Sequence, residues 1–279
     1  MSHQDLYRIR DFVPDFDAIS AEFTTRSQAL TASANVLSDI RYGDRAREVM
    51  DIVLPNNVKA GAPLHVFVHG GYWRSGEKEN YRLVAEPIVA AGAVAAIIEY
   101  DLMPQSRLDL LVDQVRRAVL WLQSNAGRFG ADPLRITVSG HSAGAHLSSF
   151  LAACGPDEQN RPSLPAIRGL LLVSGIYDLS GIPGSFLRDE ARMTEAEAAS
   201  WSPLTSRQLP CPSRIIAVGA DETEPFHSQA ASLQSRLTMA GEPAQLLTLQ
   251  GLNHMNVVLD LADPQGQLGQ RMMDLISSN

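Results

Sequence analysis

A serine between two glycines is the strongest chemical signal in the chain. Residues 140–144 read Gly-His-Ser-Ala-Gly, which is the pattern G-x-S-x-G around Ser142. Residues 135–139 are largely β-branched and predict a strand, whereas residues 143–153 are rich in Ala and Leu and predict a helix. A sharp strand-to-helix turn exposes the serine oxygen, and the free N–H groups of the helix point at developing negative charge. The pattern therefore indicates a nucleophilic serine.

The same strand-turn-helix context is the nucleophile elbow of the α/β-hydrolases. Strand-like and helix-like segments alternate along the rest of the chain. The expected strands are 48–54, 64–68, 94–100, 135–139, 169–174, 213–218 and 244–249. Because such alternation requires parallel strands, we expect an α/β-hydrolase fold. It would have a mostly parallel twisted sheet, helices on both faces and a site at the carboxyl ends of the strands.

A glycine pair follows an earlier strand. The apolar run 64–68 leads into residues 69–73, which read His-Gly-Gly-Tyr-Trp. In lipases and esterases of this fold, an HGG-type loop here supplies N–H donors to the oxyanion. We expect the N–H groups of Gly71 and Tyr72, together with that of Ala143, to form the oxyanion hole. The alternative is an ordinary glycine turn.

The side chains of this loop have two interpretations. Tyr72 and Trp73 either wall an aromatic substrate pocket or simply pack the loop. His69 is expected to brace the loop, and both His69 and Gly70 would border the substrate. The two basic residues that follow, Arg74 and Lys78, would meet a substrate carboxylate if either one faced the pocket rather than solvent.

A histidine after the last expected strand fits the general base. In this fold the order along the chain is serine, acid and then histidine, with the histidine in a loop after the last strand. His254 follows the strand 244–249 and the turn that begins at Gly251. It would take the proton from Ser142 and return it to the leaving group. Among the other histidines, His146 is expected to be a packing residue.

Two neighbouring carboxylates compete for the role of the acid. The strand 213–218 ends in Gly219-Ala220-Asp221-Glu222. Asp is the commoner acid in such triads, which favours Asp221, whereas the usual spacing of three residues after the glycine favours Glu222. Either carboxylate would hold His254 in the required tautomer and stabilise its cation. The spacing makes Glu222 the preferred candidate, with Asp221 as the alternative.

Together these residues resemble a known family. The stretches 69–73, 140–147, 173–179, 192–194, 202–204 and 225–229 are similar to the serine-type kynurenine formamidases, or arylformamidases. The resemblance extends from about residue 40 to about residue 260. It implies a Ser/acid/His hydrolase that removes the formyl group from N-formylkynurenine. The family's acid lies three residues after the glycine, which supports Glu222, although the family usually has Asp there.

Composition excludes several other classes of protein. The chain has 279 residues, 45% hydrophobic and 19% charged, with a net charge of −8. The negative charge argues against nucleic acid and acidic membranes as partners. Cys154 and Cys211 form no C-x-x-C motif, so no zinc site is expected. The beginning of the sequence has no apolar signal region, and no apolar run is long enough for a membrane span, so we expect a cytoplasmic protein.

The expected organisation is a single domain over residues 1–279. Residues 1–45 include a predicted helix over 18–37 and are expected to lie near the mouth of the site. Residues 178–210 interrupt the alternation with glycines, prolines and an acidic helical patch, and we expect a small cap insertion there.

The predicted activity is hydrolysis of an aryl formamide through an acyl-enzyme, with no metal or organic cofactor. One alternative is a carboxylesterase for small or aryl esters, or a related amide hydrolase, since the triad chemistry is identical. Another is a non-catalytic binding protein on the same fold. The expected partner is a small-molecule substrate, and the sequence is compatible with a homodimer.

Overall fold

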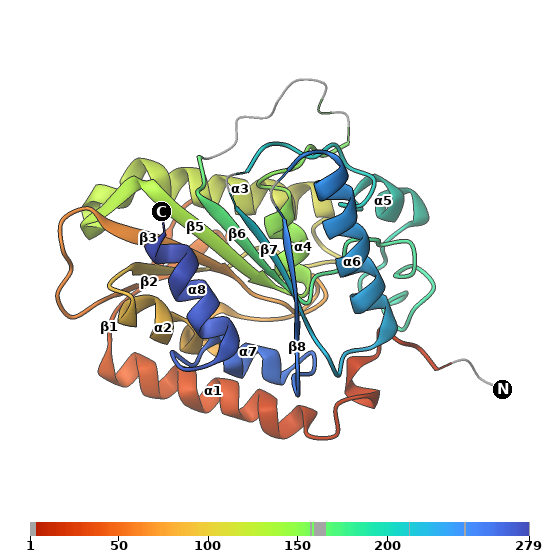
Figure 1. The fold of residues 1–279 in the computed structure, drawn as a ribbon, viewed down its shortest axis with the longest axis horizontal. Helices are drawn as coiled ribbons and strands as arrows, with labels where there is room; N and C mark the ends of the chain where they lie inside the picture. The colour runs from red at the N-terminus through yellow and green to blue at the C-terminus, as the bar shows by residue number, and fades with distance from the viewer. Residues whose placement is uncertain (1–3, 157, 159–165, 212, 243, 279) are drawn as a thin grey trace.

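A central sheet of eight strands organises the fold (Figure 1). The computed structural model describes residues 4–156, 158, 166–211, 213–242 and 244–278. The strands are β1 (Asn35–Arg41), β2 (Val49–Leu54), β3 (Ala62–Val68), β4 (Val94–Ile98), β5 (Ala131–His141), β6 (Gly169–Val173), β7 (Arg214–Gly219) and β8 (Gln245–Leu249). Their spatial order is β1-β2-β4-β3-β5-β6-β7-β8.

Most strand pairs in this sheet are parallel. Only β1–β2 and β2–β4 are antiparallel, whereas the pairs from β4 through β8 are all parallel. The interior strands β4, β6 and β7 are buried along their whole length, as expected for strands covered on both faces. The predicted mostly parallel sheet is confirmed.

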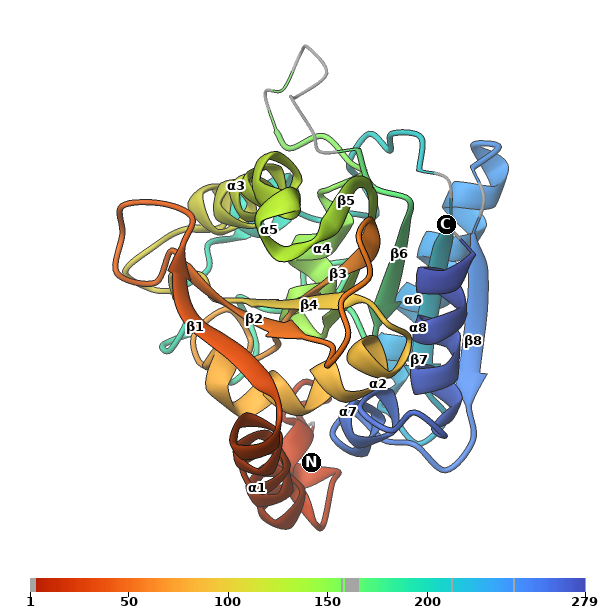
Figure 2. The same ribbon diagram turned by 90° about the vertical axis from the view of Figure 1, so that its left-hand side faces the viewer.

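Helices cover both faces of the sheet. The helical segments are η1 (Ile9–Asp11), α1 (Phe16–Ser33), η2 (Lys78–Val84), α2 (Ala85–Ala90), α3 (Leu108–Asn125), η3 (Ala126–Phe129), α4 (Ala143–Ser149), α5 (Glu195–Ser200), α6 (Glu224–Met239), α7 (Asn256–Leu261) and α8 (Gln267–Ser277). Figure 2 shows α3 and α4 on one side of the sheet and α2 and α8 on the other. None of the helices within the described ranges has the length and apolarity needed to cross a membrane.

Two local predictions were wrong. The helix predicted over 18–37 ends at Ser33, and the chain continues as the edge strand β1. This strand reads NVLSDIR and is largely exposed, so it lacks the apolar alternation from which a strand is recognised. The helix after the elbow was predicted over 143–153, but α4 ends at Ser149.

A buried histidine links the two strands that carry the predicted site. His65 on β3 contacts two hydroxyls of β5, with Nδ1 at 2.7 Å from Thr137 Oγ1 and Nε2 at 2.8 Å from Ser139 Oγ. Complete burial lowers the pKa of His65 from 6.5 to about 3. The neutral ring is therefore the form that the folded protein stabilises.

Because the folded protein stabilises the neutral ring, we expect His65 to lower the free energy of unfolding as the pH falls. Between pH 6.5 and about 3, the unfolded chain binds a proton at His65 that the folded chain excludes. The stabilisation that the neutral ring gives is complete above pH 6.5 and is lost as the pH falls towards about 3. The free energy of unfolding therefore changes by at most about 1.4 kcal/mol per pH unit from this residue. Urea unfolding of wild type and His65→Gln across this range should give a shallower slope for the variant. Identical slopes would show that His65 does not control acid stability.

Candidate active site

Ser142 occupies a strained turn between β5 and α4. Its backbone has φ 55° and ψ −119°, outside the regions that side-chain-bearing residues prefer. The flanking glycines allow the close approach that this turn needs. A Cβ at Gly140 would lie 2.4 Å from the Gly144 carbonyl oxygen, and a Cβ at Gly144 would lie 2.1 Å from the Val68 oxygen. The two glycines of G-x-S-x-G are therefore steric requirements of the turn.

A single methyl group at Gly144 should destabilise the protein. The clashing atom is a backbone carbonyl of β3, which has no free torsion with which to move away. We expect Gly144→Ala to lower the free energy of unfolding by about 1–3 kcal/mol. Gly127→Ala is the matched control, because a Cβ there meets nothing within 4 Å. Equal stability of the two variants in thermal or urea unfolding would contradict this account of the elbow.

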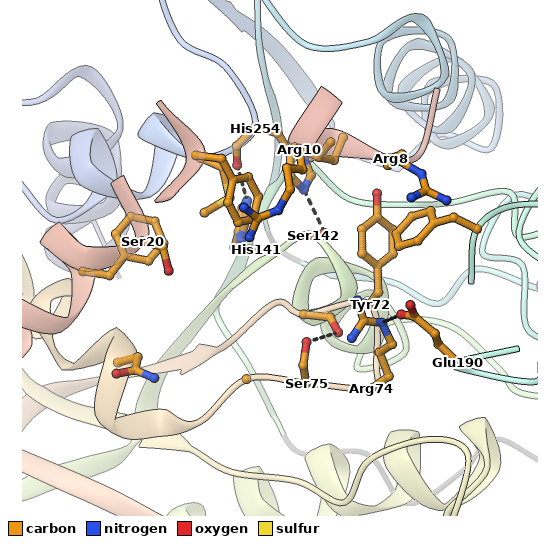
Figure 3. Close-up of a pocket in the computed structure, with 18 of the residues that line it drawn as sticks. Arg8, Arg10, Ser20, Tyr72, Arg74, Ser75, His141, Ser142, Glu190 and His254 are labelled. Atoms are coloured by element: carbon orange, nitrogen blue, oxygen red, sulfur yellow. Dashed lines mark hydrogen bonds and ion pairs between the residues drawn. The ribbon is translucent and has the colours of Figure 1, made fainter. Parts of the chain in front are cut away.

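Three predicted residues form one hydrogen-bonded chain. His254 Nε2 lies 3.0 Å from Ser142 Oγ, and His254 Nδ1 lies 2.7 Å from Glu222 Oε2 (Figure 3 shows the serine and the histidine). The Glu222 carboxylate accepts the hydrogen on Nδ1, which leaves Nε2 free to accept the serine hydrogen. All three side chains are buried or nearly so. This arrangement permits proton transfer from the serine to the imidazole.

The structure also distinguishes between the two candidate acids. The side chain of Glu222 is completely buried, and its second oxygen accepts hydrogen bonds from Gly219 N at 2.7 Å and from Ser174 Oγ at 2.5 Å. Asp221 is exposed, and its backbone N–H donates to Leu252 O. Glu222 is thus the carboxylate that contacts the histidine. Ser174 was not predicted, and only its place at the end of the neighbouring strand β6 could have indicated it.

Two rings hold the imidazole of His254 in place. Phe226 packs against it with ring centroids 4.4 Å apart, and His141 packs against it at 4.9 Å. Burial lowers the pKa of His141 well below its usual value, so this ring is neutral. His141 Nε2 donates to the His254 carbonyl oxygen at 2.9 Å. Neither contact was predicted from the sequence.

Three backbone N–H groups are available near Ser142. The N–H of Ala143 is the first of α4 and has no acceptor inside the helix. Within the described part of the chain, the N–H groups of Gly71 and Tyr72 donate no hydrogen bond. Tyr72 has φ 51°, so the loop follows an unusual backbone path beside the elbow. The predicted donors are therefore unoccupied, as an oxyanion hole requires.

Two loop side chains predicted to border the substrate lie elsewhere. Trp73 is fully buried, and its Nε1 donates to His146 Nδ1 at 3.1 Å, so it packs the loop instead of walling a pocket. His69 is also fully buried, stacked on Tyr100 and 2.7 Å from Glu99 Oε1. Neither side chain lines the cavity, because both are buried beneath the loop, where their ring nitrogens have hydrogen-bond partners.

The other two substrate candidates also need correction. Gly70 does not line the cavity, because it faces the ring of His141 below the loop. Lys78 is buried, and its ammonium group pairs with the carboxylates of Asp39, Asp51 and Glu79. It is therefore unavailable to a substrate carboxylate. Arg74 lines the cavity, with Nε 2.5 Å from Glu190 Oε2.

A cavity of about 500 Å³ opens above Ser142 (Figure 3). Besides Ser142 and His254, it is lined by Gly71 and Tyr72 of the glycine loop. Residues 8–23 form a second wall, and Phe186 and Glu190 come from the segment 178–210. Both segments that the sequence singled out thus contribute to the cavity.

The potential metal ligands and the two cysteines are all dispersed in the described part of the chain. No three His, Cys, Asp or Glu side chains among them are grouped so that they could hold a metal ion. Cys154 and Cys211 are both buried and unpaired with each other.

Comparisons with known proteins agree with this geometry. The family model BD-FAE matches residues 50–219. The kynurenine formamidase of Salmo salar is 30% identical over 264 residues, covering 92% of this chain and 87% of the relative. A probable isoprenylcysteine alpha-carbonyl methylesterase of Oryza sativa subsp. japonica is 28% identical, covering 88% and 64%. The esterase LipW of Mycobacterium marinum has the same fold, with a TM-score of 0.73 at 21% identity, covering 96% and 88%.

The first two matches decide the family, since each covers more than half of this chain and the range 50–219 includes the elbow and the glycine loop. The predicted family and the predicted hydrolase activity are both confirmed. The chain is a hydrolase of the α/β-hydrolase fold that matches the BD-FAE family model and belongs to the family of the kynurenine formamidases.

Proposed function

We propose that this hydrolase cleaves aryl formamides such as N-formylkynurenine, through a formyl-enzyme on Ser142. The observation that carries the proposal is the chain of hydrogen bonds Ser142–His254–Glu222 at the floor of the cavity. Its relatives named kynurenine formamidase supply the substrate class. The only other reactant is water.

The first step forms the formyl-enzyme. Ser142 Oγ attacks the formyl carbon while His254 Nε2 removes the hydroxyl proton across their 3.0 Å hydrogen bond. The Glu222 carboxylate stabilises the imidazolium that forms. The N–H groups of Gly71, Tyr72 and Ala143 stabilise the oxyanion, and each such donor lowers the barrier by about 3–4 kcal/mol.

The second half of the reaction releases the products. His254 donates its proton to the nitrogen of the aromatic amine as the C–N bond breaks, because an anilide anion is too basic to leave unprotonated. Water then attacks the formyl ester, with His254 again removing a proton, and formate leaves Ser142. Each proton taken by His254 is returned, so the enzyme is regenerated.

A carboxylesterase is the second candidate. The relative named as a methylesterase supports it, and so does the fold shared with an esterase. Esters pass through the same tetrahedral intermediate and the same oxyanion hole, so the triad does not discriminate between the two activities. The difference lies in the walls of the cavity and in the leaving group.

Substrate preference separates the two candidates. We expect kcat/KM on N-formylkynurenine to exceed that on p-nitrophenyl acetate, and Ser142→Ala to lower both by several orders of magnitude with an unchanged fold. Steady-state assays of both proteins on both substrates provide the test. Efficient ester cleavage with little formamide cleavage would favour the carboxylesterase, and wild-type turnover by Ser142→Ala would overturn the mechanism.

The acid is tested by a matched pair of neutral substitutions. Glu222→Gln keeps the size of a buried side chain that contacts His254, and we expect kcat to fall by about 10³–10⁴-fold because the imidazolium loses its counter-charge. Asp221→Asn alters an exposed neighbour and should leave kcat within a few-fold of wild type. Similar losses in the two variants would show that the acid has been misassigned.

A further inference from the structure

Three arginines line the cavity, and they differ in what neutralises them. Arg10 contacts both carboxylate oxygens of Asp17, at 2.7 and 2.6 Å. Arg74 pairs with Glu190 at 2.5 Å. Arg8 has no carboxylate within ion-pair distance among the residues that the structure describes. Its charge is therefore available to a ligand.

Two aromatic rings connect the side chain of Arg8 to the glycine loop. Its guanidinium carbon is 5.1 Å from the centroid of the Phe186 ring, and Phe186 in turn packs edge-to-face against Tyr72 at 5.5 Å. Tyr72 carries one of the free N–H groups beside Ser142. Figure 3 shows Arg8 and Tyr72 together at one end of the cavity, with Ser20 at the other. A ligand bound to Ser142 would thus have a cation at the far end of its leaving group.

Hydrogen bonds from three elements hold the backbone around Arg8. The hydroxyl of Tyr72 donates to the Tyr7 carbonyl oxygen at 2.5 Å, and the N–H of Phe186 donates to Asp5 Oδ2 at 2.5 Å. The Thr223 hydroxyl donates to another carbonyl of this segment at 2.8 Å. Although the side chain of Arg8 is exposed, its Cα is anchored to the glycine loop, to segment 178–210 and to the start of α6.

Ion pairs leave Arg8 as the lining arginine whose charge is not cancelled. Asp17 neutralises Arg10 and Glu190 neutralises Arg74, so Arg8 and Asp11 are the lining charges without an ion-pair partner among the described residues. An arginine without a carboxylate partner at the wall of a cavity favours an anionic ligand. A guanidinium matches a carboxylate with two parallel hydrogen bonds.

We propose that Arg8 determines specificity by binding the carboxylate of an amino-acid substituent on the aryl formamide. The inference rests on the proposed function and adds a second group that the site recognises, the carboxylate, to the neutral formamide. The formyl end would lie at Ser142, and the amino-acid end would lie at the rim beside Phe186. Arg8 acts on binding and not on the reacting atoms, so its loss should raise KM more than it lowers kcat.

A pair of substrates tests this assignment. N-formylkynurenine carries the carboxylate, and ortho-formamidoacetophenone has the same ring and formamide without the amino acid. We expect Arg8→Gln to lower kcat/KM on N-formylkynurenine about 10- to 100-fold, mainly through KM, and to change kcat/KM on the second substrate less than about two-fold. Arg8→Lys should restore part of the loss, because it keeps the charge but not the paired geometry.

Arg128→Gln is the matched control. Arg128 is also exposed and also lies over an aromatic ring, 5.6 Å from the centroid of Trp121, but it is outside the cavity. Its substitution should leave both substrates unaffected. Equal losses of Arg8→Gln on both substrates, or no loss on either, would overturn the role of Arg8 and leave the proposed function intact. A wild-type enzyme that cleaves neither formamide would overturn both.

Discussion

The contact between two backbones, at Gly144 and at the end of β3, is the constraint on which the site depends. A Cβ at Gly144 would lie 2.1 Å from the Val68 oxygen and 2.5 Å from the His69 oxygen, so only a glycine permits this separation. The contact joins two motifs about 70 residues apart in the sequence, because β3 and β5 are paired and Val68 lies opposite Gly140. The contact therefore places the N–H of Ala143 beside the glycine loop that follows β3. An oxyanion hole made from two segments requires this close packing, since its donors must converge on one oxygen within about 3 Å.

The order of the strands in the sheet then assembles the proton relay. The neighbours β5, β6, β7 and β8 are parallel, so their carboxyl ends lie side by side. Each end contributes one member: Ser142 after β5, Ser174 after β6, Glu222 after β7 and His254 after β8. The buried Glu222 carboxylate is held by Gly219 and Ser174 as well as by His254, so its negative charge is compensated when the imidazole is neutral. A parallel sheet thus converts residues more than 100 positions apart into a single hydrogen-bonded chain.

Sequence patterns could predict the features that depend on the order of the chain and on local sterics. They failed for the features that depend on contacts between distant segments. The elbow, the glycine loop and His254 each follow a recognisable strand, so their positions could be inferred before the fold was known. The choice between Asp221 and Glu222 depends on the directions in which the turn after Gly219 points two adjacent side chains. The spacing from the glycine favours Glu222 but does not give those directions. Trp73 and Lys78 could not be placed, because burial against His146 and pairing with Asp51 arise only when distant segments meet. The strand β1 could not be predicted because it is an exposed edge strand, and its sequence has no apolar alternation.

The division of labour within the molecule explains why one family can share its chemistry with esterases and still differ in substrate. In the proposed mechanism, the segments that follow the strands supply the nucleophile, the base and the oxyanion donors, and these treat a formamide and an ester alike. The cavity walls come from residues 8–23, from residues 71–81 and from Phe186 and Glu190, which belong to no strand of the sheet. A formyl group needs almost no space beyond the oxyanion hole, so the cavity of about 500 Å³ is available to the leaving group. Selectivity must then arise where the leaving group meets those walls, and changes there can redirect the enzyme to another substrate without disturbing Ser142 or its partners.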